Sequence, residues 1–397
     1  MNKLKILFIN DFGYRLGGVE VNLINQAFEL RRRGYTIKIL TSDANPSNSS
    51  LVSDYTFKSY SDKSLSRLFN QIIYIPSYLK LKNVIEEYQP HIIFLHNIFH
   101  SVSPSVLLAV GNIPTILALH SYELICPTGA IIKQDGSRCV SPGSHDLRCT
   151  GSLKGYVYEH IKQEIHRLLL KKVAAYIAPS ESIKRDFTNQ RPISSQIRMI
   201  YNGIEPAKYE PIKNFNRILY VGRLSKEKGI DVLLKAINKI KKEIPNIKVD
   251  IVGDGPEAEH LKSLSESLNL QNTVFFSGKV EKDKVNDYYN KCTFLVLPSV
   301  CPESFSLVGI EALNIGRPVI GSNLGAIPEW LIDMKCGFLF NPGDVDNLVE
   351  KSLTLLKNKT MLLNMSKYGS KYSRKFSNDT NVDNLEKLFF ELTNKKI

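Results

Sequence analysis

Long hydrophobic runs are missing from this 397-residue sequence. No run approaches the roughly 20 apolar residues that a transmembrane helix needs. The amino-terminal segment has only one short apolar stretch, Ile6–Ile9, after its lysines. That stretch is too short for the core of a signal peptide, so we interpret it as part of a first strand. The sequence therefore predicts a cytoplasmic protein.

Signatures of nucleic-acid binding are also missing, as is a complete dinucleotide-binding motif. No helix-turn-helix, zinc-finger or RNA-binding signature occurs. Gly17 and Gly18 follow the first predicted strand and precede an amphipathic segment, but the full G-x-G-x-x-G is absent. We expect these glycines either to form a tight turn or to let the backbone approach a ligand closely.

Acidic residues are outnumbered by basic ones, and the formal net charge is +13. Residues 1–205 hold 24 Lys and Arg against 16 Asp and Glu, an excess of 8, whereas the remainder has an excess of 5. This charge indicates either a solvated basic surface or attraction to an anionic partner. A lipid leaflet and a phosphate-rich substrate are both such partners.

Two successive stretches alternate short apolar runs with amphipathic segments, which is the pattern of parallel strands and helices. A linker containing Pro206 and Pro211 separates them. The sequence therefore predicts an α/β protein with two Rossmann-like domains facing across a cleft. The predicted parts are residues 1–205, residues 206–378 and a last helical segment at 379–397.

The stretch Pro298–Ser322 carries the most specific chemistry. It follows a buried strand and contains a polar loop with Glu303, a helix from about Ser306 with Glu311 on it, and a further strand. Backbone N–H groups at a helix start bind anions. The predicted donors are the N–H groups of Phe305, Ser306 and Leu307. This arrangement suits a nucleotide sugar, with the diphosphate at the helix start and the two carboxylates on sugar hydroxyls.

Basic and imidazole side chains follow other predicted strands. Arg223 and Lys228 come after one strand of the second half and can neutralise a diphosphate without a metal. His96 and His120 each end a strand of the first half, where open α/β sheets bind ligands.

The second half resembles glycosyltransferase family 4, a retaining family with the GT-B fold whose bacterial members include envelope polysaccharide enzymes. The matching pieces occur in the family's order over nearly the whole half. They are Asn202-Gly203-Ile204, Gly222-Arg223-Leu224, Lys228-Gly229, Gly253-x-Gly255-Pro256, Gly278-x-Val280, Pro298-Ser299, Glu303-x7-Glu311, Gly316-x-Pro318-Val319 and Asn341-Pro342.

The resemblance assigns roles to the donor-binding half. It implies that Glu311 binds the ribose hydroxyls, that Glu303 binds the donor hexose and that the Val280 backbone binds the base. It adds Asn202 and Gly203 to the donor site, and it implies that Asp383–Thr393 crosses back onto the first domain.

The resemblance also assigns the first half to the acceptor. Gly17 and Gly18 resemble the family's glycine loop near the diphosphate, and His120 resembles the histidine that contacts the donor hexose. His96 and Ser180 are weaker candidates near the acceptor. The catalytic set implied is Arg223, Lys228, Glu303 and His120, with no cofactor required.

Three cysteines and a histidine fall in a Gly-, Ser- and Pro-rich loop at 121–152. They are Cys126, Cys139, His145 and Cys149. Three thiolates and an imidazole form a reasonable structural zinc site. Because no C-x-x-C pair is present, we favour reduced cysteines in an acceptor-binding loop.

The segment Tyr156–Lys172 is predicted to form an amphipathic helix. We expect its apolar residues, which are Val157, Ile161, Ile165, Leu168 and Leu169, to face the core. A role at a membrane surface is the alternative, because the helix is basic and acceptors in this family are often lipid-linked.

The sequence predicts a retaining glycosyltransferase that moves a hexose from a UDP- or GDP-sugar to a saccharide or lipid-linked acceptor. It would act in the cytoplasm or on the inner face of the membrane, in envelope polysaccharide or lipopolysaccharide synthesis. Two alternatives stay open: a non-catalytic sugar-nucleotide-binding protein and a GT-B sugar-nucleotide epimerase.

Overall fold

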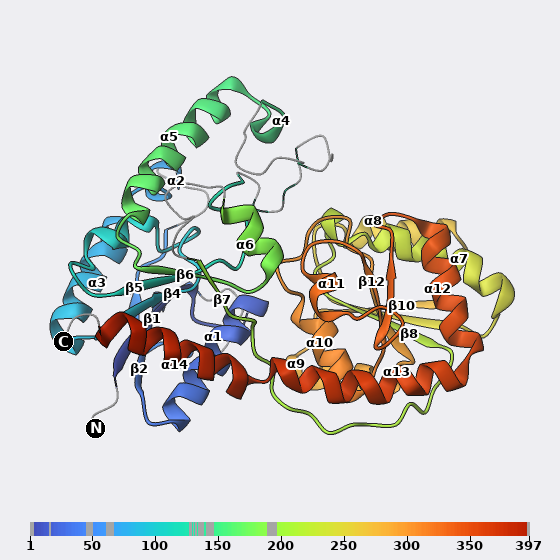
Figure 1. The fold of residues 1–397 in the computed structure, drawn as a ribbon. Helices are drawn as coiled ribbons and strands as arrows, with labels where there is room; N and C mark the ends of the chain where they lie inside the picture. Colours follow the sequence, from blue (N-terminus) through green and yellow to red (C-terminus); the bar gives the residue numbers. More distant parts are fainter. Residues whose placement is uncertain are drawn as a thin grey trace. The chain divides into compact units, whose positions relative to one another are not determined.

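A computed structural model describes residues 4–15, 17–44, 51–60, 67–126, 129, 131, 133, 139, 147–188 and 197–394. The chain divides into two compact units (Figure 1). Unit 1 is Met1–Gly203 with Asn378–Ile397, and unit 2 is Ile204–Ser377. Both units contain a parallel sheet, which confirms the predicted α/β class.

The sheet of unit 1 has the strand order β3-β2-β1-β4-β5-β6-β7, and all its pairs are parallel. Its central strands are buried on both faces, as their continuous apolar sequences predict. The strands are β1 (Lys5–Phe12), β2 (Thr36–Ser42), β3 (Tyr55–Phe57), β4 (Ile92–Leu95), β5 (Thr115–Ala118), β6 (Ala175–Ala178) and β7 (Ile197–Met199).

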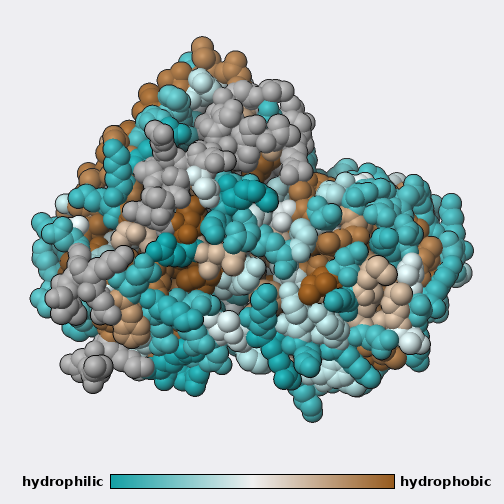
Figure 2. All heavy atoms as spheres, viewed as in Figure 1, coloured by the Kyte–Doolittle hydropathy of each residue, from teal (hydrophilic) through white to brown (hydrophobic). Residues whose placement is uncertain are grey.

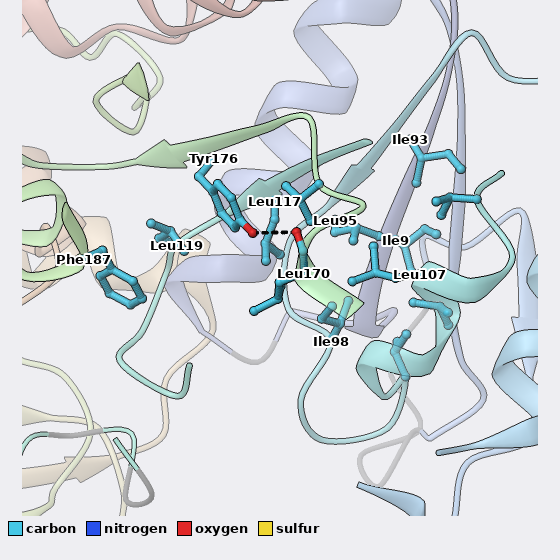
Figure 3. Packing of buried hydrophobic residues seen from close by; sticks show 14 of the residues in the cluster. Ile9, Ile93, Leu95, Ile98, Leu107, Leu117, Leu119, Leu170, Tyr176 and Phe187 are labelled. Carbon is cyan, nitrogen blue, oxygen red and sulfur yellow. Dashed lines mark hydrogen bonds between the residues drawn. The ribbon is translucent and has the colours of Figure 1, made fainter. Parts of the chain in front are cut away.

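Two apolar clusters hold this sheet in place. One contains Leu117, Leu170 and Tyr176, and the Tyr176 hydroxyl donates a hydrogen bond to the Leu170 carbonyl at 3.0 Å (Figure 3). The helices of unit 1 are α1 (Gly18–Arg32), α2 (Arg67–Asn70), α3 (Ile75–Tyr88), η1 (Pro104–Leu108), α4 (Leu147–Thr150), α5 (Leu153–Leu170), α6 (Glu181–Thr188) and α14 (Asn378–Asn394).

The last helix, α14, packs in unit 1 although it follows unit 2 in the sequence. Phe389 lies in an apolar cluster with Phe94. Arg33, at the end of α1, donates to Asp383 at 2.6 Å and to Glu386 at 2.8 Å. The end of the chain therefore helps to build the first domain.

The sheet of unit 2 has the order β10-β9-β8-β11-β12-β13, again with parallel pairs. Its strands are β8 (Arg217–Val221), β9 (Lys248–Val252), β10 (Val274–Gly278), β11 (Phe294–Leu297), β12 (Val319–Ser322) and β13 (Gly337–Phe340). Its helices are η2 (Lys226–Lys228), α7 (Ile230–Glu243), α8 (Ala258–Ser267), α9 (Lys282–Lys291), α10 (Leu307–Ile315), α11 (Ile327–Trp330), α12 (Val345–Lys357), α13 (Lys359–Tyr372) and η3 (Ser373–Phe376).

The prediction that α5 turns its apolar residues to the core is wrong for three of them. Val157, Ile161 and Leu168 are exposed by 48%, 52% and 64%. Leu169 packs partly buried against the core, and the buried residues of the helix are Gln163, His166 and Leu170. Within the described part of the chain, no helix is long and apolar enough to cross a membrane.

Candidate functional site

The candidate site of unit 2 lies where its strand order reverses, between β8 and β11. Loops at the carboxyl ends of two such strands are where open α/β sheets bind ligands. These loops are in close contact, because a Cβ atom on Gly229 would lie 2.1 Å from the Pro298 carbonyl oxygen. Gly229 also has a φ of +64°, which favours glycine. A close approach of two backbones therefore fixes Lys228 beside the loop that follows β11.

Lys228 and Glu303 form an ion pair across these two loops. Lys228 Nζ donates to Glu303 Oε1 at 2.7 Å, and Ser299 Oγ donates to the same oxygen at 2.6 Å. Burial acts to raise the pKa of Glu303, but attraction to Lys228 and the two hydrogen bonds outweigh it and leave the pKa below its ordinary value. Glu303 is therefore a carboxylate at neutral pH. Both of these hydrogen bonds use Oε1, so within the described residues Oε2 is the oxygen of this carboxylate that can accept from a ligand.

The helix predicted to bind an anion begins one residue later than expected, at Leu307. Ser306 precedes it in the left-handed region, with a φ of 67°, and gives no side-chain cap to the helix. The Phe305 carbonyl accepts a hydrogen bond from Trp330 Nε1 at 2.7 Å. This contact, and the packing of Gly309 against the Trp330 ring, hold the unusual turn in place. The Gly309 N–H donates to the Ser306 carbonyl at 3.2 Å, so within the described residues the Leu307 and Val308 N–H groups are the donors of this helix start that could bind an anion.

Glu311 lies on α10 and is held by α9. The hydroxyl of the buried Tyr289 is shared between the Val308 carbonyl at 3.2 Å and Glu311 Oε2 at 3.3 Å, and Lys282 Nζ lies 3.7 Å from Oε1. Arg223 has an exposed side chain, and its carbonyl accepts from the Tyr220 hydroxyl at 2.9 Å. This contact fixes the backbone of the loop while the guanidinium faces solvent.

Three other predicted donor residues lie outside this cluster of contacts. Val280 is partly buried, in the loop between β10 and α9. Asn202 and Gly203 belong to unit 1. A Cβ atom on Gly203 would lie 2.5 Å from Asn378 Oδ1, so this glycine is needed for packing against α14.

The candidate site of unit 1 also lies at a reversal of strand order, between β1 and β4. Asn10, at the end of β1, accepts from the Asn97 backbone at 3.0 Å and donates to Glu20 Oε1 at 3.2 Å. Glu20 Oε2 in turn accepts from the Gly17 N–H at 3.0 Å. This buried network orients the glycine turn at the start of α1. The Gly17 N–H is therefore engaged in a hydrogen bond within the protein, and a ligand that contacts this N–H would have to share it with Glu20.

Asp11 plays a second structural role at the same edge. Its two carboxylate oxygens accept four backbone hydrogen bonds from residues 99–102, at 2.6–3.0 Å. The Asp11 side chain thereby holds the loop that follows β4.

His96 and His120 are brought together at the ends of β4 and β5. His96 Nδ1 lies 3.2 Å from His120 Nε2, and the two rings are stacked. His96 is buried, whereas His120 is partly exposed. Ser180 is also buried, and its hydroxyl accepts from the Ile183 N–H at the start of α6. The structure therefore gives Ser180 the role of a helix cap.

The predicted zinc site cannot be described as a whole, because His145 lies outside the described residues. Cys126, Cys139 and Cys149 are all buried. Within the described residues, no group of three or more His, Cys, Asp or Glu side chains is arranged to hold a metal ion.

Sequence pattern did not identify several residues that position the candidate sites. Asn10 follows an apolar run directly, and Ser299 lies two residues after one, as ligand-binding residues of such sheets do, so these positions could have indicated their roles. Tyr289 and Trp330 act from other helices over long sequence separations, and nothing in the local sequence indicates their partners.

Two family models match adjoining parts of the chain. The model described as "Glycosyltransferase Family 4" matches residues 16–208, and the model described as "Glycosyl transferases group 1" matches residues 203–372. An uncharacterized glycosyltransferase of Methanocaldococcus jannaschii is 26% identical over 393 residues, which cover 98% of this chain and 99% of that protein.

Solved structures share the fold at low sequence identity. Sucrose-phosphate synthase from Thermosynechococcus elongatus matches with a TM-score of 0.79 and 19% identity, over 99% of this chain and 100% of that one. HepE from Anabaena, solved in complex with UDP-glucose, matches with a TM-score of 0.72 and 19% identity, over 98% and 100%.

Proposed function

The chain belongs to the group 1 glycosyltransferases of family 4, with the GT-B fold, and on that premise we propose that it is a retaining hexosyltransferase that uses a UDP-sugar. The observation that carries this proposal is the set of contacts among Lys228, Glu303 and Ser299 beside the start of α10. A cation, a fixed carboxylate and a helix N-terminus are what a sugar diphosphate needs. UDP is chosen because the structurally similar HepE was solved with UDP-glucose.

In the proposed reaction the donor lies over the strand reversal of unit 2. Glu303 Oε2 accepts from a hexose hydroxyl, Glu311 binds the ribose hydroxyls and the Val280 backbone binds the base. Arg223, Lys228 and the first N–H groups of α10 stabilise the negative charge that develops on the β-phosphate. No metal is required for this role.

The chemical step breaks one bond and forms one. The bond from the anomeric carbon to the β-phosphate oxygen breaks, and its electron pair leaves with the nucleoside diphosphate. The acceptor hydroxyl attacks the same face of the anomeric carbon, and its proton passes to the departing phosphate. The configuration is thereby retained without a covalent sugar–enzyme intermediate, and Glu303 serves as a binding group rather than a nucleophile.

Ligand-induced stabilisation tests the donor site, because a ligand that binds only the folded state raises its stability. UDP-, GDP-, ADP- and CMP-sugars are screened by thermal shift, and nucleotide release is then measured with each binder. We expect a UDP-sugar to bind and UDP release to be lost in Glu311→Ala but kept in the control Glu350→Ala on α12. Failure of every donor to bind or turn over contradicts the proposal.

We further propose that unit 1 docks reversibly on an anionic membrane surface, so that a lipid-linked saccharide serves as the acceptor. The exposed residues Leu153, Val157, Ile161 and Leu168 are spaced by four and seven along α5 and form one apolar stripe. Figure 2 shows apolar atoms along the outer side of α5. Apolar patches of this kind mark interaction surfaces.

The charges around this stripe favour anionic lipid over a second protein chain. Both acids on α5 are paired, Glu159 with Lys162 and Glu164 with Arg167. Among the described residues no acid pairs with Lys154, Lys171 or Lys172, so these lysines add positive charge at the two ends of the helix. Basic residues beside a shallow apolar face are typical of helices that lie in the membrane interface.

Sedimentation with lipid vesicles tests this surface. We expect the full-length protein to bind phosphatidylcholine–phosphatidylglycerol vesicles and to bind pure phosphatidylcholine weakly. The double variant Val157→Ser/Ile161→Ser should partition about tenfold less strongly. Phe28→Ser on α1, which removes an apolar residue that is more exposed than Val157 and Ile161, serves as the control. Equal binding by both variants, or a change of oligomeric state in the double variant, contradicts the lipid assignment.

A further inference from the structure

His96 and His120 form a pair of imidazoles in which the deeper ring is incompletely hydrogen-bonded. His96 Nδ1 and His120 Nε2 are 3.2 Å apart, with ring centroids at 5.4 Å and planes inclined by 12°. His96 is 1% exposed. Its Nε2 is buried and has no hydrogen-bonding partner among the described residues.

The surroundings keep both rings neutral. Phe94 and Phe8 lie against His96 with centroid distances of 4.4 Å and 5.1 Å. Burial, with a smaller effect of His120, puts the pKa of His96 well below its ordinary value. Burial also lowers the pKa of His120, to about 4. A neutral pair can share this contact only if one ring donates its N–H and the other accepts.

Two arrangements of the protons satisfy that condition, and they differ in whether the buried Nε2 of His96 carries a proton. If His120 donates from Nε2, His96 must carry its own proton on Nε2, where an N–H would be buried between phenyl rings without an acceptor. If His96 donates from Nδ1, its Nε2 is a bare lone pair. Buried N–H groups without acceptors are rarer in proteins than acceptors with an unused lone pair, so the second arrangement is favoured.

We propose that His96 is a positioning residue that holds His120 in the tautomer protonated on Nδ1. In this state His120 accepts at Nε2 and presents an N–H donor at Nδ1. His120 is partly exposed at the carboxyl edge of the sheet, so Nδ1 is its polar atom left for a ligand. Resting on the proposed function, the group that receives this hydrogen bond is a hydroxyl of a sugar substrate bound to unit 1.

Nitrogen NMR of the full-length protein labelled with ¹⁵N-histidine reads the tautomers directly. Signals of His120 are identified by their loss in His120→Gln, and those of His96 by their loss in His96→Asn. We expect protonated Nδ1 and bare Nε2 on both rings at neutral pH. Protonated Nε2 on His120, or an imidazolium, overturns the proposal whatever the enzyme's activity.

Two isosteric variants separate positioning from packing. The amide of His96→Asn can donate to His120 as Nδ1 does, whereas the carboxylate of His96→Asp can only accept. We expect turnover of His96→Asn within about threefold of the wild type and a loss of about tenfold or more in kcat for His96→Asp. The Asp variant should also move the His120 proton to Nε2. Equal turnover in the two folded variants contradicts the proposal, whereas absence of transfer in the wild type contradicts only the proposed function.

Discussion

Replacement of Lys228 by methionine tests whether this lysine keeps Glu303 ionised in the candidate site of unit 2. Methionine keeps most of the aliphatic stem but removes the cation that faces Glu303 at 2.7 Å. The carboxylate then keeps only the hydrogen bond from Ser299. Burial, the largest influence on Glu303, is no longer balanced, so we expect the pKa of Glu303 to rise above its ordinary value.

The expected loss of stability follows from the exposure of the two side chains. Breaking a fully buried ion pair costs about 3–5 kcal/mol. The side chains of Lys228 and Glu303 are 28% and 12% exposed, so water screens part of this effect. We expect Lys228→Met to lower the free energy of unfolding of unit 2 by about 2 kcal/mol at neutral pH.

The pH dependence has a definite sign. In the wild type the lowered pKa of Glu303 stabilises the folded state above the unfolded pKa, and this contribution is lost as the pH falls through the folded pKa. In Lys228→Met the raised pKa destabilises the folded state at neutral pH, and protonation relieves this as the pH falls. The difference between the two proteins should therefore shrink toward about pH 4.

Urea unfolding followed by the fluorescence of Trp330 measures this effect. Trp330 is the only tryptophan in the sequence and lies buried in unit 2, so its signal reports that unit. Lys226→Met, a change at an exposed lysine of the same turn, is the control and should stay within about 0.5 kcal/mol of the wild type. A pH-independent loss, or strict additivity of Lys228→Met with Glu303→Gln, would refute the reasoning.

Three other contacts give sharp expectations. Tyr289→Phe removes the hydroxyl that holds Glu311, so KM for the donor should rise about fivefold with kcat little changed; an unchanged KM contradicts this role. Gly309→Ala places a Cβ atom 2.2 Å from the Trp330 ring, so unit 2 should lose about 2 kcal/mol in the same urea assay, and a neutral effect would contradict the packing. Arg33→Met breaks ion pairs to α14, so amide hydrogen exchange of α14 should accelerate, while Arg167→Met should leave it unchanged.

Local pattern was sufficient to predict buried strands in both units, although it did not predict β13. The runs Ile92–Leu95 and Phe294–Leu297 are buried on both faces, and continuous apolar sequence is characteristic of such strands. Pattern also placed Glu303 and Glu311 on a loop and the following helix. The strands, the loop and the helix are determined by residues that are close in the sequence, so they can be predicted from a single sequence.

The exposure of the two faces of α5, and contacts between residues far apart in the sequence, could not be predicted in the same way. An amphipathic pattern indicates that α5 has two faces, but not that its apolar face meets solvent while Gln163 and His166 turn inward. Likewise, nothing near Glu303 in the sequence reveals that Lys228, 75 residues earlier, neutralises it. The left-handed Ser306 depends on Trp330, which belongs to a later helix.

The stereochemistry of donor turnover tests the central claim most directly. Time-resolved proton NMR of a UDP-hexose that binds the protein follows both UDP release and the first sugar product, before the free sugar equilibrates. We predict that the first product keeps the α configuration of the donor, and that Lys228→Met, but not Lys226→Met, loses most of this activity. A first product of β configuration, or full activity without Lys228, would contradict the proposed mechanism.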